Sequence, residues 1–201
     1  MCGRYYIDDE TAREIERLIR QMDKKRSLES VETVERIGTG DIYPGREAPV
    51  LSEKDGSLCC VWQHWGIPGF QGKKLIFNAR CESALEKPLF RDSVRHRRIV
   101  IPAAWFYEWS PRKEKNTFFR KDMPVLFMAG FSKPYEDGEH FVILTTAANS
   151  SMKPVHDRMP LILEKEEIAD WMLDDSKTEA MLHRFPCLLE RRSDYEQMSL
   201  F

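Results

Sequence analysis

The chain has 201 residues, of which 42% are hydrophobic and 32% charged, so it can bury a core and is not an intrinsically disordered protein. Its formal net charge is −2, which excludes bulk basicity as a basis for binding nucleic acid; such binding would need a local basic patch. No apolar run approaches the roughly 20 residues of a membrane span, and the amino terminus lacks the features of a signal peptide. We therefore expect a soluble intracellular protein with one domain over residues 1–201.

The spacing of apolar residues predicts a mixture of helices and strands. Residues 2–7 are expected to form a short strand, followed by a helix over 9–25 that Asp8 or Asp9 can cap. A second helical segment is predicted from about 164 to 184. Further strands are predicted at 48–51, 58–65, 75–81, 97–101, 105–109, 117–120, 125–131 and 140–147. The pattern indicates an α+β domain built on a curved or barrel-like antiparallel sheet with flanking helices.

The five cysteines give little support for a disulfide framework or a structural zinc site, because their number is odd and no CxxC pair is present. We expect no metal and no other cofactor. Core positions are predicted for all but Cys2, namely for Cys59, Cys60, Cys81 and Cys187.

Cys2 suggests chemistry because it directly follows the initiator methionine. A small second residue usually permits removal of that methionine, which would leave a cysteine with a free α-amine. Such an amine has a pKa of about 7.7–8.0 and a free thiol one of about 8.5, so both groups are partly nucleophilic near neutral pH. This 1,2-aminothiol can condense with an aldehyde through its amine and then close a thiazolidine ring through its thiol. It could instead attack an amide bond as an N-terminal nucleophile.

Alternation along two predicted strands brings polar residues to common faces. In a strand over 2–6, Cys2 and Arg4 share a face. In a strand over 75–81, Asn78 and Arg80 share a face opposite apolar neighbours. The arrangement is consistent with a site, although an arginine in such a position is also common in surface ion pairs.

Glu108 and His156 are the candidates for proton transfer. Glu108 lies among aromatic residues in the stretch 105–109, where a buried carboxylate is costly unless it is paired or neutral. Burial would raise its pKa toward the working pH, which suits a group that donates and accepts protons. A solvent-facing glutamate paired with a basic side chain is the alternative. His156 follows a predicted strand and precedes Pro160, in a kind of loop that often carries catalytic residues, but a structural histidine also fits.

Basic residues cluster around the predicted strand at 97–101, close to the aromatic residues of the stretch 62–70. A cationic groove lined with rings is typical of proteins that bind single-stranded nucleic acid, whereas charge runs also occur as solvated faces. The clustered residues are Arg91, Arg95, Arg97, Arg98, Arg112, Lys113 and Lys115.

Several short motifs follow one another from residue 1 to about 165. They are Met1-Cys2-Gly3-Arg4-Tyr5, Trp65-Gly66-Ile67-Pro68, Phe77-Asn78-Ala79-Arg80-Cys81-Glu82-Ser83, Lys87-Pro88-Leu89-Phe90-Arg91, Arg97-Arg98-Ile99-Val100-Ile101-Pro102, Phe106-Tyr107-Glu108-Trp109, Thr145-Thr146-Ala147-Ala148-Asn149 and His156-Asp157-Arg158-Met159-Pro160. In content and order they resemble the SRAP family, the SOS response-associated peptidase domain.

The resemblance implies a sensor of abasic sites in single-stranded DNA, acting in the DNA damage (SOS) response. Members of the family trap the ring-opened sugar aldehyde with the N-terminal cysteine as a thiazolidine crosslink. Removal of Met1, which could be autoproteolytic, and weak abasic-site lyase activity are implied as accompanying reactions. The crosslinking reaction needs only one subunit and no metal or cofactor, so we expect a monomer in the cytoplasm, associated with the nucleoid.

The same resemblance implies a role for each matching residue. Cys2 would be the nucleophile, Asn78 would steady the sugar, and Glu108 and His156 would move protons. Contacts with DNA are implied for Arg4, Arg80, Trp65, Phe70 and Arg158.

Two other functions remain open at this point. One is an N-terminal-nucleophile cysteine peptidase that acts in trans on another substrate. The other is a non-catalytic protein that binds single-stranded DNA through the cluster at 91–98.

Overall fold

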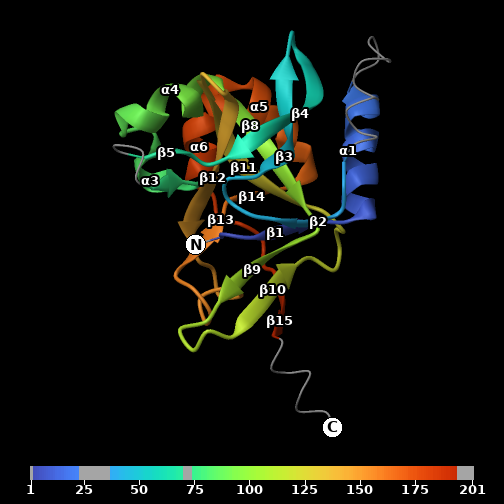
Figure 1. The fold of residues 1–201 in the computed structure, drawn as a ribbon, viewed down its shortest axis with the longest axis vertical. Coiled ribbons are helices and arrows are strands. Elements are labelled where there is room, and N and C mark those ends of the chain that lie inside the picture. The colour runs from blue at the N-terminus through green and yellow to red at the C-terminus, as the bar shows by residue number, and fades with distance from the viewer. Residues whose placement is uncertain (1, 23–36, 70–73, 194–201) are drawn as a thin grey trace.

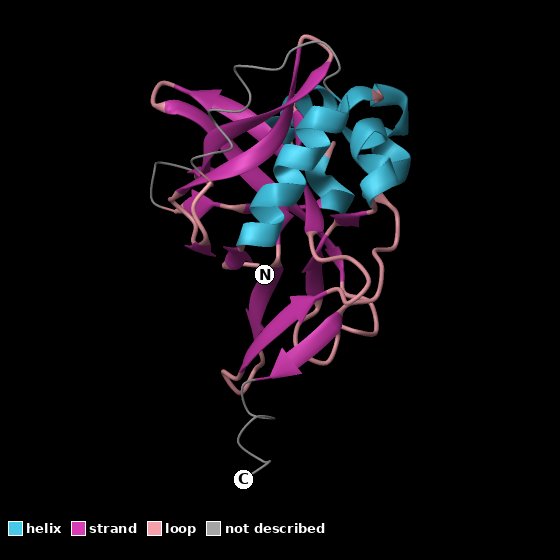
Figure 2. Ribbon diagram, turned by 90° about the vertical axis from the view of Figure 1, so that its right-hand side faces the viewer, coloured by secondary structure: helices cyan, strands magenta, loops and turns pink. Residues whose placement is uncertain are grey.

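The computed structural model of this chain describes residues 2–22, 37–69 and 74–193. Two β-sheets lie one below the other, and helices pack around the larger sheet (Figure 1, Figure 2). The first strand of the chain lies where the two sheets meet (Figure 1). The α+β class predicted from the sequence is confirmed.

Five strands of the larger sheet close into a barrel. β4 (Ser57–Trp65) pairs with β3 (Glu47–Lys54), β3 with β8 (Arg98–Ala103), β8 with β11 (Leu126–Tyr135), and β11 with β12 (Gly138–Ala147). β12 also pairs with β4, which completes the ring. This closing pair is parallel, unlike the antiparallel sheet that the sequence predicted. Parallel partners come from distant parts of a chain, so local periodicity does not reveal them.

Three short strands extend the barrel sheet. β7 (Asn78–Arg80) runs parallel to β12, β13 (Arg158–Pro160) pairs with the end of β12, and β14 (Ile162–Leu163) pairs with β11. The strand predicted at 75–81 is therefore divided. Its first part, β6 (Leu75–Ile76), pairs with β5 (Ile67–Pro68), and only β7 joins the barrel.

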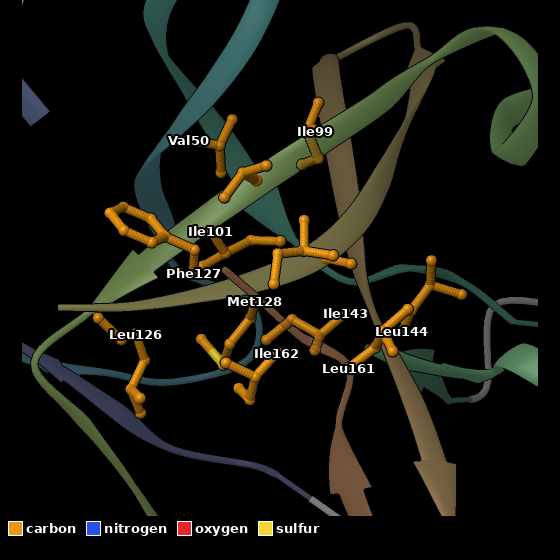
Figure 3. Close-up of a cluster of buried hydrophobic side chains, with 14 of the residues drawn as sticks. Val50, Ile99, Ile101, Leu126, Phe127, Met128, Ile143, Leu144, Leu161 and Ile162 are labelled. Carbon is orange, nitrogen blue, oxygen red and sulfur yellow. The ribbon is translucent and has the colours of Figure 1, made fainter. Parts of the chain in front are cut away.

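Buried hydrophobic side chains from β3, β8, β11 and β12 form a cluster in the larger sheet (Figure 3). All six residues of β8 are buried, so this strand is covered on both faces. Removing apolar surface from water contributes about 25 cal/mol per Å² to stability, and these strands supply much of that surface. Labelled side chains of this core are Val50, Ile99, Ile101, Leu126, Phe127, Met128, Ile143, Leu144, Leu161 and Ile162.

The second sheet carries the start of the chain. Its strand order is β15 (Glu190–Ser193), β10 (Lys115–Phe119), β9 (Trp105–Trp109), β1 (Tyr5–Ile7) and β2 (Gly40–Ile42). The chain passes from β8 of the barrel directly into β9, so the two sheets are covalently continuous at this corner. β1 pairs with both β2 and β9 and is thereby fixed beside the barrel.

Helix α1 (Asp9–Met22) forms where the sequence predicted it. Asp8 caps the helix, since its Oδ1 accepts the backbone N–H of Thr11 at 2.8 Å. Its apolar face is buried against the barrel through Ile15, Leu18 and Ile19. No helix in the described part of the chain is long and apolar enough to cross a membrane.

The other helices differ from the prediction. The helix expected at 164–184 is broken into α5 (Ile168–Leu173) and α6 (Thr178–Leu182), because Asp174 has an extended backbone and its side chain caps the next turn. The sequence analysis missed α3 (Cys81–Ala84) and α4 (Pro88–His96), which carry the motifs after Asn78.

Arg98 corrects the expected cationic cluster. Its side chain is only 2% exposed and donates to Asp175 at 2.5 Å and to the carbonyls of Val94 and Met172 at 3.3 and 3.5 Å. The guanidinium therefore joins α4 and α5 to the barrel and presents no charge to a ligand, so the prediction of a shared basic face at 91–98 is wrong for this residue.

Gly130 offers a direct test of the barrel. A methyl group there would lie 2.5 Å from Cδ1 of Ile101 and 2.6 Å from the carbonyl oxygen of Val142. We expect Gly130→Ala to lower the free energy of unfolding by about 1–3 kcal/mol through overpacking. Gly38→Ala, with no heavy atom within 4 Å of the added carbon, is the control and should change it by less than about 0.5 kcal/mol. Equal urea midpoints for the two variants would show that the barrel tolerates the added methyl group.

Candidate functional site

Cys2 lies just before β1, and two parts of the fold fix its position. The N–H of Tyr107 donates to the carbonyl of Arg4 at 3.0 Å, which continues the pairing between β1 and β9. Asn78 Nδ2 donates to the carbonyl of Cys2 at 2.8 Å. The side chain of Cys2 is 1% exposed. The residue is thus held between the barrel strand β7 and the second sheet.

The thiol of Cys2 lies close to a buried carboxylate. Burial raises the pKa of the Cys2 thiol well above its usual value, and the negative charge of Glu108 raises it further. The thiol is therefore protonated at neutral pH in this structure. Glu108 is itself buried in β9, opposite Asn116 of β10. The tertiary structure thus brings Cys2 and Glu108 into one electrostatic environment.

One polar atom of the Asn78 side chain, Oδ1, has no hydrogen-bond partner in the part of the chain that the structure describes. While Nδ2 bonds to Cys2, the Oδ1 atom is buried and accepts no hydrogen bond from the residues that the structure describes. Leaving a buried acceptor unsatisfied costs about 1–3 kcal/mol. The side chain is therefore placed beside Cys2 with an acceptor available for a bound hydroxyl group.

His156 lies in the loop between β12 and β13. Its Nδ1 atom is 3.0 Å from the backbone nitrogen of Arg158 and 3.0 Å from Oδ1 of Asp157. The backbone N–H of Arg158 donates to an unprotonated Nδ1, whereas the Asp157 carboxylate accepts from a protonated one, so the two contacts favour opposite tautomers of the ring. An imidazole in this position can therefore donate or accept a proton.

Hydrogen bonds of the Asn149 side chain hold the loop that carries His156. Asn149 Nδ2 donates to the carbonyls of Pro186 and Cys187 at 3.1 and 2.8 Å, and its Oδ1 accepts the N–H of Ser151 at 3.0 Å. The N–H of His156 closes the same loop by donating to the carbonyl of residue 152. Asn149 Nδ2 thus joins the loop to the segment at 186–187, while Oδ1 is satisfied within the loop, and together these bonds give the loop a defined conformation.

Arg4 is held between two aromatic rings. Its guanidinium carbon lies 5.0 Å from the ring centroid of Tyr43 and 4.8 Å from that of Tyr107. It also forms an ion pair with Asp41. Hydrogen bonding with Asp41 raises the pKa of Arg4, so its charge is permanent.

The other two predicted arginines differ in accessibility. Arg80 is exposed at the end of β7. Arg158 is 11% exposed and forms a bidentate ion pair with Glu82, with N–O distances of 2.6 and 2.8 Å, while donating to the carbonyl of Thr145 at 2.6 Å. Thr145 in turn pairs with Arg80 across β12 and β7. Arg158 thereby connects the segment after Asn78 to the loop of His156.

Trp65 does not lie on a DNA-binding surface in this structure. Its side chain is fully buried, with Nε1 donating to the carbonyl of Phe77 at 3.0 Å and the ring packed against Tyr5 and Phe141. The prediction that Trp65 contacts DNA is therefore wrong for the described fold. The large apolar surface of its indole ring is buried in the core instead, where it stabilises the fold. Phe70, the other predicted aromatic contact, lies outside the described residues.

Several residues of this region were not singled out by the sequence analysis. Asp41 lies in β2 and Tyr43 directly follows that strand, and no local sequence pattern identifies either as part of a site. Glu82, Tyr107 and Asn149 lie inside quoted motifs, but nothing in their spacing assigned them a partner. Within the described ranges, no group of three or more His, Cys, Asp or Glu residues is arranged to hold a metal ion.

Solved structures share this fold. A protein from Bacteroides thetaiotaomicron superposes with a TM-score of 0.77 at 22% identity, covering 96% of this chain and 91% of the other. A phage-related protein from Bordetella bronchiseptica gives a TM-score of 0.73 at 21% identity, covering 96% of this chain and 93% of the other. At such low identity the similarity concerns the fold alone.

Curated relatives match in sequence over part of their length. Abasic site processing protein YedK from Escherichia coli K12 is 35% identical over 146 residues, which cover 69% of this chain and 66% of YedK. Abasic site processing protein YoaM from Bacillus subtilis 168 is 33% identical over 122 residues, or 54% of each chain. The matched segments thus span about two-thirds or half of these relatives. The family described as SOS response associated peptidase (SRAP) matches residues 1–199, and this chain therefore belongs to the SRAP family.

Proposed function

We propose that this protein processes abasic sites in single-stranded DNA by forming a thiazolidine crosslink through Cys2 after removal of Met1. The observation that carries the proposal is the placement of Cys2 between the amide of Asn78 and the carboxylate of Glu108. The names of the relatives, abasic site processing proteins, support the same substrate.

The first step is opening of the abasic sugar. The sugar rests mainly as a closed hemiacetal, so O4′ must gain a proton and the C1′ hydroxyl must lose one before an aldehyde exists. His156 supplies the proton to O4′, and the proton of the C1′ hydroxyl passes to solvent. Asn78 Oδ1 accepts a hydrogen bond from a sugar hydroxyl and so satisfies its buried acceptor. A positioned acid or base of this kind typically contributes about 10²–10⁴-fold to the rate.

The second step joins protein and DNA. The α-amine of Cys2 attacks C1′, and Glu108 takes protons from the nitrogen and returns them to the oxygen, which leaves as water and gives an imine. The thiol sulfur then bonds to C1′, and its proton passes to the imine nitrogen. The thiazolidine contains both reactants less one water. Because burial keeps the thiol protonated, the amine reacts first and the thiol only closes the ring.

An imine beside the 3′ phosphate is also open to β-elimination, which would break the strand. Weak abasic-site lyase activity is therefore a side reaction of the same intermediate, and rapid ring closure limits it. Autoproteolytic removal of Met1 would precede the crosslink, because it creates the free amine, and peptidase activity in trans is the alternative use of the resulting aminothiol.

The first prediction concerns Cys2 itself. Incubation with an abasic single strand should add the oligonucleotide mass less one water to a protein that lacks Met1, as measured by intact mass spectrometry. Cys2→Ala should abolish the adduct, whereas Cys59→Ala should retain it. A free amino-terminal Cys2 that forms no adduct but cleaves peptides would favour the peptidase, and an equal adduct from Cys2→Ala would contradict the proposal.

Glu108→Gln tests the proposed base, because the amide keeps the shape of the side chain but cannot accept the proton. We expect adduct formation to slow by about 100-fold in single-turnover kinetics, with little change in binding to an undamaged strand. Glu114→Gln, in the nearby turn before β10, is the control and should react like the unmodified protein. A change of less than twofold in Glu108→Gln would remove this residue from the mechanism.

The pH dependence distinguishes the two nucleophiles of Cys2. Adduct formation should rise from pH 6, reach half of its maximum near the α-amine pKa of about 7.7–8.0, and level off roughly one pH unit higher, where deprotonation of the amine is nearly complete. The raised pKa of the thiol means that thiolate is scarce throughout this range. A rate that keeps rising tenfold per pH unit above pH 9 would show instead that thiolate attack limits the reaction.

A further inference from the structure

We propose that Asp41 and Glu82 act as internal substitutes for DNA phosphates: they pair with Arg4 and Arg158 in the free protein and give way to backbone phosphates when a strand binds. This inference rests on the proposed function, because it takes single-stranded DNA as the ligand. It makes the two carboxylates determinants of specificity for damaged over undamaged strands.

Glu82 occupies Arg158 as a phosphate would. Both of its oxygens accept from the two terminal nitrogens of Arg158, at 2.6 and 2.8 Å, the parallel arrangement that arginine also makes with phosphate. Hydrogen bonding to Arg158 lowers the pKa of Glu82, so the carboxylate is charged at neutral pH. The Glu82 side chain is 48% exposed and can move into solvent, which would uncover the Arg158 side chain that is 11% exposed while the pair is formed.

Arg4 is paired less completely. Asp41 contacts one terminal nitrogen, while Nε is buried and has no acceptor among the residues that the structure describes. The rings of Tyr43 and Tyr107 contact the guanidinium, with centroids 5.0 and 4.8 Å from its central carbon. A phosphate can therefore take the place of Asp41 at the terminal nitrogens while these ring contacts remain.

The exchange has a predictable energetic consequence. Ion pairs between partly exposed groups contribute about 0.2–1 kcal/mol, so a strand can displace either carboxylate. A displaced carboxylate remains near the phosphate, and like charges repel. Both effects weaken binding that depends on phosphates alone. A crosslink, once formed, is not reversed by this balance, so the carboxylates lower the occupancy of undamaged strands more than that of trapped abasic strands.

Salt dependence is the signature of this arrangement. An arginine whose charge is already balanced by a carboxylate releases fewer DNA counterions on binding than an unpaired one. For single strands, each additional phosphate contact steepens the slope of log K against log salt by roughly 0.7. Removing the carboxylates should therefore increase both affinity and salt dependence.

The experiment measures binding of a thymine oligonucleotide without lesions to the full chain, by fluorescence anisotropy across a salt series. Asp41→Asn and Glu82→Gln should each bind about three- to fivefold more tightly at low salt, the range expected for loss of one such ion pair. The double variant should also show a steeper slope. Asp170→Asn, which removes the same charge from a pair with Lys177 at 2.7 Å, is the matched control and should bind like the unmodified protein.

Crosslinking to an abasic strand is followed in parallel. Unchanged or weaker binding of undamaged DNA by both folded variants would overturn the inference and leave only a positioning role for the carboxylates. Tighter binding without any crosslink, even in the unmodified protein, would support phosphate substitution but contradict the thiazolidine mechanism. If no protein binds the strand at low salt, the inference and the proposed function are both wrong.

Discussion

Strand β12 is the element on which the rest of the structure depends, because it pairs with β4, β7, β11 and β13. Its parallel pairing with β4 closes the barrel, and its parallel pairing with β7 holds Asn78 beside the start of the chain. Its far end leads into the loop of His156. Backbone hydrogen bonds of a buried strand cannot be exchanged for water without a large cost, so these segments keep a fixed relation. The candidate site is the place where that scaffold meets β1.

Burial and a neighbouring negative charge act together on Cys2. A carboxylate and a thiol are buried next to each other, which keeps the thiol protonated and limits its reactivity with other electrophiles. Free from its initiator methionine, Cys2 would present an amine as the stronger nucleophile. In the proposed mechanism, burial of the thiol therefore favours attack by the amine first and ring closure by the thiol second.

The arginines around the site differ in how completely their charges are paired within the fold. Arg98 is fully committed to carbonyl groups and a carboxylate within the fold, whereas Arg4 and Arg158 are paired with single partly exposed carboxylates. A chain of net charge −2 cannot attract DNA by its overall field. Under the proposed function, binding would therefore depend on local arginines, and the proposed exchange makes their ion pairs control when that charge is available.

The sequence by itself determined the α+β class, helix α1 with its Asp8 cap, the approximate barrel strands and the family. These features depend on local periodicity, capping residues and ordered motifs, all of which can be read along the chain. Only the tertiary structure decided that Trp65 is core, that Arg98 is structural, that the closing strand pair is parallel and that Asp41 and Glu82 hold two arginines. Each of these outcomes involves partners far apart in the chain, because burial and ion pairing depend on which segments pack together and not on spacing within one segment.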